Sequence, residues 1–247
     1  ASVQKVYEDE LQRIVKKHCK KVNLVLSGGC ALNCVANSNI KRNIWIMPNP
    51  GDSGSSLGCI PAVTKQRLNW KGPFLGYNIR GEYPVDSIIK ELETNKMVGV
   101  ANGRAEFGPR ALGNRSLLAD PRGPEVKDMV NEIKKRQKFR PFAPAILLED
   151  VHDYFDMPQE TSPYMQFVGK CKYPKEFPAI IHADGTSRVQ TVTKEDNEGF
   201  YNLLKTWKDK TGCPMLLNTS LNIKGMPMVN DRWDARKFEE KYNVKVV

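Results

Sequence analysis

The sequence predicts a mixed α/β fold, and three observations support this class. Hydrophobic residues make up 40% of the 247 residues, enough to bury a sizeable core. Short apolar runs such as Met97–Ala101 alternate with amphipathic stretches such as Val85–Asn95. Turns rich in glycine and proline separate these segments. Strands that alternate with helices are typical of α/β architectures.

The charge is distributed unevenly. The chain carries 38 Lys and Arg against 28 Asp and Glu, a net charge of +10, which suggests an anionic partner. Residues 1–76 hold 11 basic against 4 acidic residues, or +7, so the remainder is close to neutral. A breaker-rich stretch, residues 69–76, lies at this change, and we place a domain boundary there between 1–76 and 77–247.

The composition also excludes several classes. No apolar run reaches the roughly 20 residues of a membrane helix, and the charged N-terminal stretch is no signal peptide. Six cysteines without a C-x-x-C pair predict reduced thiols in a cytoplasmic protein. Because the chain begins with Ala1 instead of Met, we expect it to be a fragment of a longer protein.

In the first part, helical spacing of apolar residues predicts a helix over Ser2–His18, and Val22–Leu26 predicts a buried strand. The strand leads into the glycine turn Ser27–Asn33. A strand, a tight glycine turn and a helix start present free backbone N–H groups to an anion. The alternative is an ordinary strand-to-helix turn.

A second strand is predicted over Ile44–Met47, followed by a loop rich in proline and glycine that carries Asp52. A carboxylate on such a loop can hold a metal ion near phosphates. The alternative is that Asp52 caps a helix or turn.

The second part opens with the predicted helix Val85–Asn95 and the strand Met97–Ala101. The segment Asn102–Arg122 then carries four arginines among glycines and prolines. A guanidinium pairs bidentately with phosphate or carboxylate and keeps its proton, so these arginines suggest an anion site. The alternative is a solvated loop.

Residues Pro124–Gln137 predict a helix whose basic end complements the helix dipole. An extended apolar stretch over Phe139–Leu148 follows, and Arg140 in it is an anion candidate. Next, Ile180–Val192 predicts a hairpin that turns at Asp184-Gly185. Arg188 and Gln190 would share one face of it.

Two further features stay open. His182 suits a proton carrier, a phosphate contact or a packed core residue. The predicted strand Met215–Leu217 leads into the hydroxyl- and amide-rich Asn218–Asn222, which suits phosphate or nucleotide binding as well as an ordinary turn.

Taken together, these motifs resemble the O-carbamoyltransferases of nodulation-factor and antibiotic tailoring. The matching strings run in family order: Leu26–Asn33, Pro50–Ser56, Gly103–Arg122, Lys135–Pro144, His182–Val192 and Leu217–Asn222. The resemblance implies an actin-like (ASKHA) domain joined to a YrdC-like domain with a twisted mixed sheet. Residues 77–247 would be the YrdC-like domain, and residues 1–76 would be the C-terminal part of the actin-like domain.

The chemistry implied by the resemblance is the formation of carbamoyl adenylate from carbamoyl phosphate and ATP, with Mg²⁺. The carbamoyl group would then move to an acceptor hydroxyl on a small molecule, a glycan or a nucleoside. The resemblance assigns catalytic roles to Arg110, Lys135, Arg188 and His182. It assigns carbamoyl phosphate and ATP binding to Arg104, Arg115, Arg140, Asn218, Thr219 and Ser220. In the actin-like part, Ser27, Gly28, Gly29 and Asn33 would bind the nucleotide, and Asp52 would ligate a divalent metal, usually iron.

One departure is the absence of the family's metal-binding histidines, which lie upstream of these motifs; His18 does not match them. We therefore expect the missing N-terminal half to complete the metal site and to supply much of the acceptor site. A homodimer stays open. Two alternatives remain: a tRNA-linked YrdC-like enzyme, and a basic nucleic-acid-binding module, which no RNA-recognition motif supports.

Overall fold

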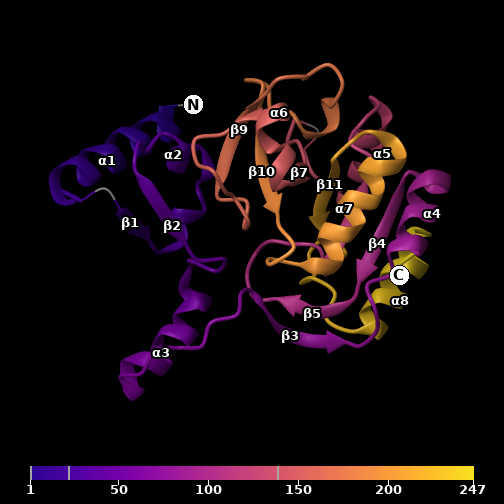
Figure 1. The fold of residues 1–247 in the computed structure, drawn as a ribbon, viewed down its shortest axis with the longest axis horizontal. Coiled ribbons are helices and arrows are strands. Elements are labelled where there is room, and N and C mark those ends of the chain that lie inside the picture. Colours follow the sequence, from indigo (N-terminus) through magenta and orange to yellow (C-terminus); the bar gives the residue numbers. More distant parts are fainter. Residues whose placement is uncertain (1, 22, 138) are drawn as a thin grey trace.

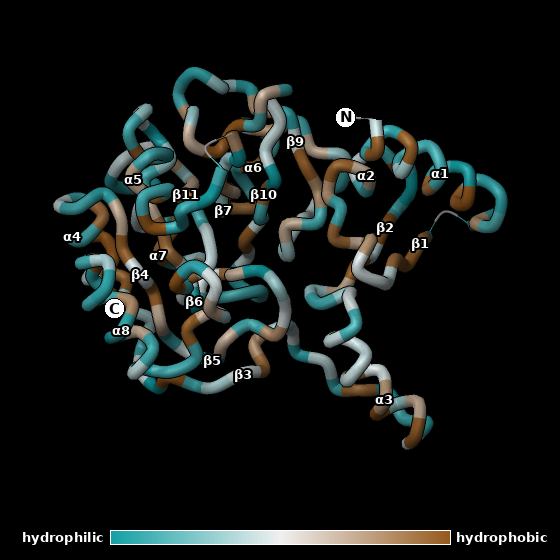
Figure 2. Tube along the Cα trace, turned by 180° about the vertical axis from the view of Figure 1, so that it is seen from behind, coloured by the Kyte–Doolittle hydropathy of each residue, from teal (hydrophilic) through white to brown (hydrophobic). Residues whose placement is uncertain are grey.

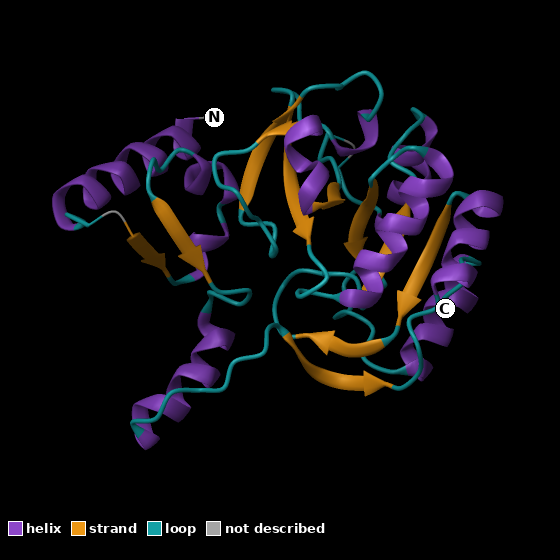
Figure 3. Ribbon diagram, in the orientation of Figure 1, coloured by secondary structure: helices purple, strands orange, loops and turns teal. Residues whose placement is uncertain are grey.

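The protein is described by a computed structural model that covers residues 2–21, 23–137 and 139–247 (Figure 1). A small N-terminal region stands beside a larger region built on a seven-stranded sheet. Strands and helices alternate along the chain, which confirms the mixed α/β class (Figure 3).

The small region is built from α1 (Ser2–His18), β1 (Asn23–Leu26), α2 (Cys34–Ser38) and β2 (Asn43–Ile46). The predicted helix is confirmed, and its basic last turn complements the helix dipole. The two strands pair in parallel. The first strand was predicted to begin at Val22, which lies outside the described residues. A small core contains Val15, Ala31, Ile40, Ile44 and Ile46, together with Phe167 of the large region.

Helix α3 (Ser55–Thr64) extends away from the body of the molecule (Figures 1 and 2). None of its residues is buried, although it is apolar, and the Val63 side chain is 82% exposed. The chain then runs without regular structure to β3 (Phe74–Ile79), which begins inside the predicted boundary stretch. In the described part of the chain, no helix combines the length and the apolar character that a bilayer span requires.

The large sheet has the strand order β4-β6-β11-β7-β10-β9-β8. Strands β7 and β10 are parallel, whereas the other neighbours are antiparallel, so the sheet is mixed. The strands span β4 (Met97–Ala101), β6 (Arg115–Ala119), β7 (Ala143–Leu147), β8 (Phe155–Asp156), β9 (Phe167–Cys171), β10 (Thr186–Val192) and β11 (Met215–Ser220). A separate pair joins β3 to β5 (Gly103–Glu106).

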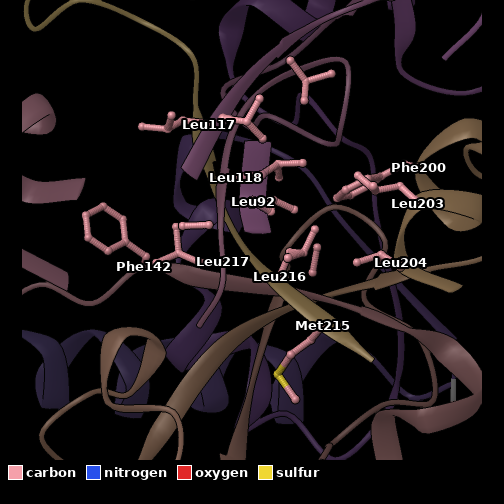
Figure 4. Packing of buried hydrophobic residues seen from close by; sticks show 14 of the residues in the cluster. Leu92, Leu117, Leu118, Phe142, Phe200, Leu203, Leu204, Met215, Leu216 and Leu217 are labelled. Atoms are coloured by element: carbon pink, nitrogen blue, oxygen red, sulfur yellow. The ribbon is translucent and has the colours of Figure 1, made fainter. Parts of the chain in front are cut away.

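Helices α4 (Val85–Asn95) and α7 (Glu198–Thr211) pack against each other and against this sheet. Their apolar side chains and those of the central strands form the main core (Figure 4). Leu92 of α4, Phe200 of α7 and Leu118 of β6 are all buried there. The remaining helices are α5 (Glu125–Lys134), α6 (Val151–Tyr154) and α8 (Arg232–Tyr242).

The predicted hairpin over Ile180–Val192 is wrong. Residues Pro178–Ile180 form a short 3₁₀ helix, and only Thr186–Val192 is a strand. That strand pairs antiparallel with β9 and parallel with β7. Strand β10 is an interior strand that pairs with β7 on one side and with the preceding strand β9 on the other, so the segment just before its turn is not its partner.

Three further boundaries differ from the prediction. Helix α5 ends at Lys134 instead of Gln137, and the extended stretch becomes a strand only at Ala143. Asn218 does not begin a turn, because β11 continues through Ser220 in register with β6.

The two regions contact each other along β9. The backbone N–H of Val168 donates to Ser38 Oγ at 2.8 Å, and Gln166 Nε2 donates to the carbonyl of Ile46 at 3.1 Å. Phe167, between them, is 3% exposed and packs in the small core. Strand β9 of the large sheet therefore completes the core of the small region.

Candidate anion-binding site

A cavity of about 420 Å³ lies where α2, the segment after α5 and the turn before β10 meet. We call it the arginine pocket. Its walls contain three arginines, Arg136, Arg140 and Arg188, and the other lining residues are Cys34, Phe139, Pro141, Phe142, Ala143, His182, Ala183 and Asp184. The pocket brings together Arg140, His182 and Arg188, three of the residues singled out from the sequence, and adds Arg136 and Cys34.

Arg188 projects from the central strand β10 into this pocket. Burial, reinforced by the nearby charge of Arg110, lowers the pKa of its guanidinium to about 10. In the described part of the chain, no carboxylate forms an ion pair with Arg188. A buried cation without a counter-ion is costly, and its presence is typical of a site that receives an anion.

Arg110 belongs to the same electrostatic cluster. Its Nε is buried without a hydrogen-bond partner, and burial and the charge of Arg140 lower the pKa of Arg110. The chain reaches this position through Gly108, which adopts a φ of +151°. A Cβ at Gly108 would lie 2.8 Å from the carbonyl oxygen of Pro48. Glycine therefore lets the arginine segment approach the small region closely.

Arg136 is held rigidly at the rim of the pocket. Its Nη2 donates to the carbonyl of Pro141 at 2.6 Å, and its guanidinium stacks 3.9 Å from the ring centre of Phe142. Burial and the charge of Arg140 lower the pKa of Arg136 to about 10. The sequence pattern did not single out this residue, because the basic run at the end of a helix has an ordinary explanation in the helix dipole.

The resemblance assigns a catalytic role to Lys135, but the neighbouring Lys134 is the lysine with a partly buried ammonium group. Its Nζ donates to the carbonyl of Ser220 at 2.8 Å, to Ser220 Oγ at 3.1 Å and to Asn222 Oδ1. Burial and the charge of Arg136 lower its pKa to about 8. Lys135 follows the end of α5 in a left-handed conformation and is exposed, with its carbonyl accepting from Lys224 Nζ.

His182 is half-buried in the pocket wall, where its Nδ1 lies 2.9 Å from Thr186 Oγ1. Burial lowers the pKa of its imidazole, although the nearby Asp184 carboxylate opposes this shift. The imidazole is therefore neutral at physiological pH and can exchange a proton with a bound group.

The predicted binding residues of β11 divide between two faces of the sheet, because side chains alternate along a strand. Asn218 and Ser220 share one face, whereas Thr219 points to the other. Asn218 is buried and donates from Nδ2 to Gln190 Oε1 at 2.7 Å, while its own Oδ1 has no partner. Ser220 holds Lys134, as described above.

Arg115 and Arg104 lie outside the arginine pocket. Arg115 is fully buried, with 0% exposure. Its guanidinium donates to the carbonyls of Asn102 and Tyr77, each at 2.9 Å, and of Asn230 at 3.0 Å. Arg104 is exposed on β5 and donates to the carbonyl of Gly76 at 3.2 Å. Neither guanidinium is placed to reach a ligand in the pocket.

The glycine turn of the small region holds the other predicted nucleotide residues. Gly28 adopts a φ of +98°, and its N–H donates to the carbonyl of Pro50 at 2.7 Å. Ser27 and Gly29 are exposed. The Asn33 side chain caps α2 by accepting from the N–H of Ala36 at 3.1 Å. The turn thus has free space above it, while the Asn33 amide is already used in part.

Asp52 begins a short 3₁₀ helix beside this turn, and its carboxylate is exposed. Among the residues that the structure describes, no three His, Cys, Asp or Glu side chains gather into a group that could hold a metal ion. Asp52 alone supplies one ligand, so the residues present do not make a metal site, and no chemical step is derived through a metal.

The site is thus a pocket beside a mixed α/β sheet, lined by three arginines that form no ion pair in the part of the chain that the structure describes. The chain belongs to the carbamoyltransferase family, since the model described as Carbamoyltransferase C-terminus matches residues 89–247 and that described as Carbamoyltransferase N-terminus matches residues 1–60. The family resemblance inferred from the motifs is therefore confirmed.

Several curated relatives are similar over most of this chain. Nodulation protein NolO of Bradyrhizobium diazoefficiens is 35% identical over 95% of the chain and 50% of its own length. Nodulation protein U of Sinorhizobium fredii is 38% identical over 82% of the chain and 40% of its own length. The uncharacterized protein sll1178 of Synechocystis is 35% identical over 95% of the chain and 48% of its own length. The chain thus spans about half the length of these relatives.

Proposed function

We propose that this chain forms carbamoyl adenylate from carbamoyl phosphate and ATP, as part of an O-carbamoyltransferase that passes the carbamoyl group to an acceptor hydroxyl. The observation that carries the proposal is the arginine pocket. Both substrates are polyanions, and clustered guanidinium groups that form no ion pair in the described residues offset the repulsion between them.

The reaction balances with one molecule of water. Water takes the place of the phosphate group of carbamoyl phosphate, which gives carbamate and inorganic phosphate. A carbamate oxygen then attacks the α-phosphorus of ATP, and pyrophosphate leaves with the electron pair of the broken P–O bond. In the transfer step, the acceptor oxygen attacks the carbamoyl carbon, its proton goes to a base, and AMP leaves.

The roles of the residues follow from their positions. Arg188 in the pocket wall and Arg140 at its exposed side would neutralise phosphate oxygens. Arg110 does not line the pocket but lies close enough to lower the pKa of Arg188 and to have its own pKa lowered by Arg140, and it would add positive charge to the same ligand site. Lys134, held by Ser220 and Asn222, adds an ammonium group whose pKa burial lowers to about 8. Mg²⁺ would accompany ATP, as its phosphates usually require. His182, in the wall of the pocket, would move the proton of the attacking water.

The contacts that each side chain makes change four of the roles implied by the resemblance. We assign Arg115 to the scaffold, because its guanidinium is buried among backbone carbonyls. Lys134 takes the role first given to Lys135. Arg104 is too exposed and too engaged with β3 to serve the pocket. Thr219 takes no part in ligand binding, because its side chain lies on the other face of the sheet from Asn218 and Ser220.

In the small region, the glycine turn is proposed to contact the adenosine part of the intermediate, with Asp52 as one ligand of a divalent metal such as iron. The hydrogen bond from the N–H of Gly28 to the carbonyl of Pro50, at 2.7 Å, supports a shared site, because it holds the two loops side by side. The remaining ligands and the acceptor site are proposed to come from residues outside this chain.

The test is pyrophosphate release with ATP and carbamoyl phosphate, in the chain and in Arg110→Ala. Loss of a charge-assisted phosphate contact costs about 1.5–3 kcal/mol, so release should fall by about tenfold or more. Arg67→Ala, an exposed arginine outside the pocket, is the matched control and should leave release unchanged. Unchanged release by the folded Arg110→Ala chain would remove this residue from the site.

A further inference from the structure

A second groove, of about 800 Å³, lies between β3, β5 and the start of α8, and no residue lines both this groove and the arginine pocket. We call it the Arg–Trp groove. Its walls contain Tyr77, Arg80, Arg104, Asp231, Arg232 and Trp233. The carbamoyl chemistry proposed above uses none of these side chains.

The buried guanidinium of Arg115 fixes the three segments that form this groove. It donates to the carbonyls of Tyr77 on β3, Asn102 before β5 and Asn230 before α8. Two groove arginines are also held by neighbouring backbone, because Arg232 Nη2 donates to the carbonyl of Arg80 at 3.0 Å and Arg104 to that of Gly76. The groove is therefore preorganised.

The charge of the groove favours an anion. Three guanidinium groups face one carboxylate, and Asp231 uses that carboxylate to cap α8 by accepting from the N–H groups of Trp233 and Asp234. In the described residues, none of Arg80, Arg104 and Arg232 forms an ion pair with an acidic side chain. Guanidinium forks in this arrangement match phosphate oxygens.

The groove also exposes two large aromatic rings. Trp233 is 63% exposed and Tyr77 is 57% exposed. Lys237 Nζ lies 5.6 Å from the centre of the Trp233 ring, and the exposed fraction of this side chain leaves surface on which a planar ligand can stack. Rings that alternate with arginines are typical of surfaces on which nucleobases stack while the phosphates are neutralised.

We propose that the Arg–Trp groove binds a nucleotide, with a base stacked on Trp233 or Tyr77 and the phosphate held by Arg80, Arg104 and Arg232. The same chemistry is offered by a free nucleotide and by a single-stranded oligonucleotide. The proposal does not depend on the carbamoyl reaction, because the two sites share no residue.

The experiment uses the chain with Arg188→Ala, so that the arginine pocket does not contribute to binding. Two probes are titrated by fluorescence: etheno-AMP, and a short labelled single-stranded oligonucleotide. Trp233→Ala and Arg80→Ala should each weaken the binding of the preferred probe by about tenfold, as expected for a lost stacking or charge contact. Trp45→Ala and Arg67→Ala, which change exposed residues outside the groove, should bind like the parent.

The outcomes separate the sources of the ligand. Tighter binding of the oligonucleotide, with a steep salt dependence, identifies a single strand, and equal or tighter binding of etheno-AMP identifies a free nucleotide. Trp233→Phe should retain most of the affinity, because the ring still stacks. The proposal is overturned if neither probe binds, if Trp233→Ala binds like Trp45→Ala, or if tripolyphosphate binds as tightly as either probe.

Discussion

Replacing Arg115 separates a structural arginine from a substrate-binding one. The resemblance placed this residue among the phosphate contacts, whereas the structure buries it completely. Its guanidinium donates to five backbone carbonyls, those of Tyr77, Asn102, Gly103, Asn114 and Asn230. Arg115→Ala removes every one of these donors at once.

The magnitude follows from those acceptors. A buried polar group that loses its partner costs about 1–3 kcal/mol, and water entering the space can satisfy some of the carbonyls. Taking about 1 kcal/mol for each carbonyl gives a destabilisation of about 5 kcal/mol, which is large for a single substitution. Arg115→Lys keeps the charge and part of the donors, so its cost should be about half of this value.

The assay is urea unfolding followed by far-ultraviolet circular dichroism. With a slope of about 2 kcal/mol per molar urea, the midpoint of Arg115→Ala should fall by about 2.5 M. Arg104→Ala, which replaces an exposed arginine on β5, should shift the urea midpoint very little. The reasoning is refuted if Arg115→Ala has the same urea midpoint as Arg104→Ala and yet loses carbamoyl phosphate binding. Arg115 would then contact the substrate.

Further predictions concern the pocket and its supports. Carbamoyl phosphate affinity, measured by calorimetry, should decline above pH about 8 as Lys134 loses its proton, and Lys134→Gln should abolish that decline. Glu106→Ala should cost about 3 kcal/mol of unfolding free energy, because its carboxylate accepts from three backbone N–H groups, whereas Glu106→Gln should cost much less. Phe167→Ala should cost about 3–4 kcal/mol and increase hydrogen exchange in the small region; unchanged exchange there would contradict the shared core.

The sequence was informative where the pattern is local. The apolar spacing of α1 and α4 predicted both helices with their observed bounds, since one face of each helix is set by residues three and four apart. The strand β4 was found in the same way, because a short apolar run between turns has few other conformations. Of the pocket arginines, Arg140 was noticed because of its proline-rich surroundings and Arg188 because of its place in the predicted hairpin, whereas Arg136 was not singled out.

The features that the sequence did not reveal are those that distant segments or single boundary residues decide. The interior strand β10 pairs with β7 and with the preceding strand β9 instead of with the residues just before Asp184-Gly185, and the local turn signal does not reveal this choice. The choice between Lys134 and Lys135 depends on one residue at the end of α5, where helix boundaries are least certain from sequence. Arg115 lies in the same arginine-rich string as Arg110, and only the fold separates a buried clamp from a ligand contact.

The central claim is that this chain makes carbamoyl adenylate in the arginine pocket. Exchange of radiolabelled pyrophosphate into ATP tests it most directly, because exchange requires the reversible formation of an adenylate. The expected result is exchange that depends on carbamoyl phosphate and that falls at least tenfold in the folded Arg188→Ala chain. Exchange that needs no carbamoyl phosphate, or that persists unchanged in Arg188→Ala, would contradict the claim.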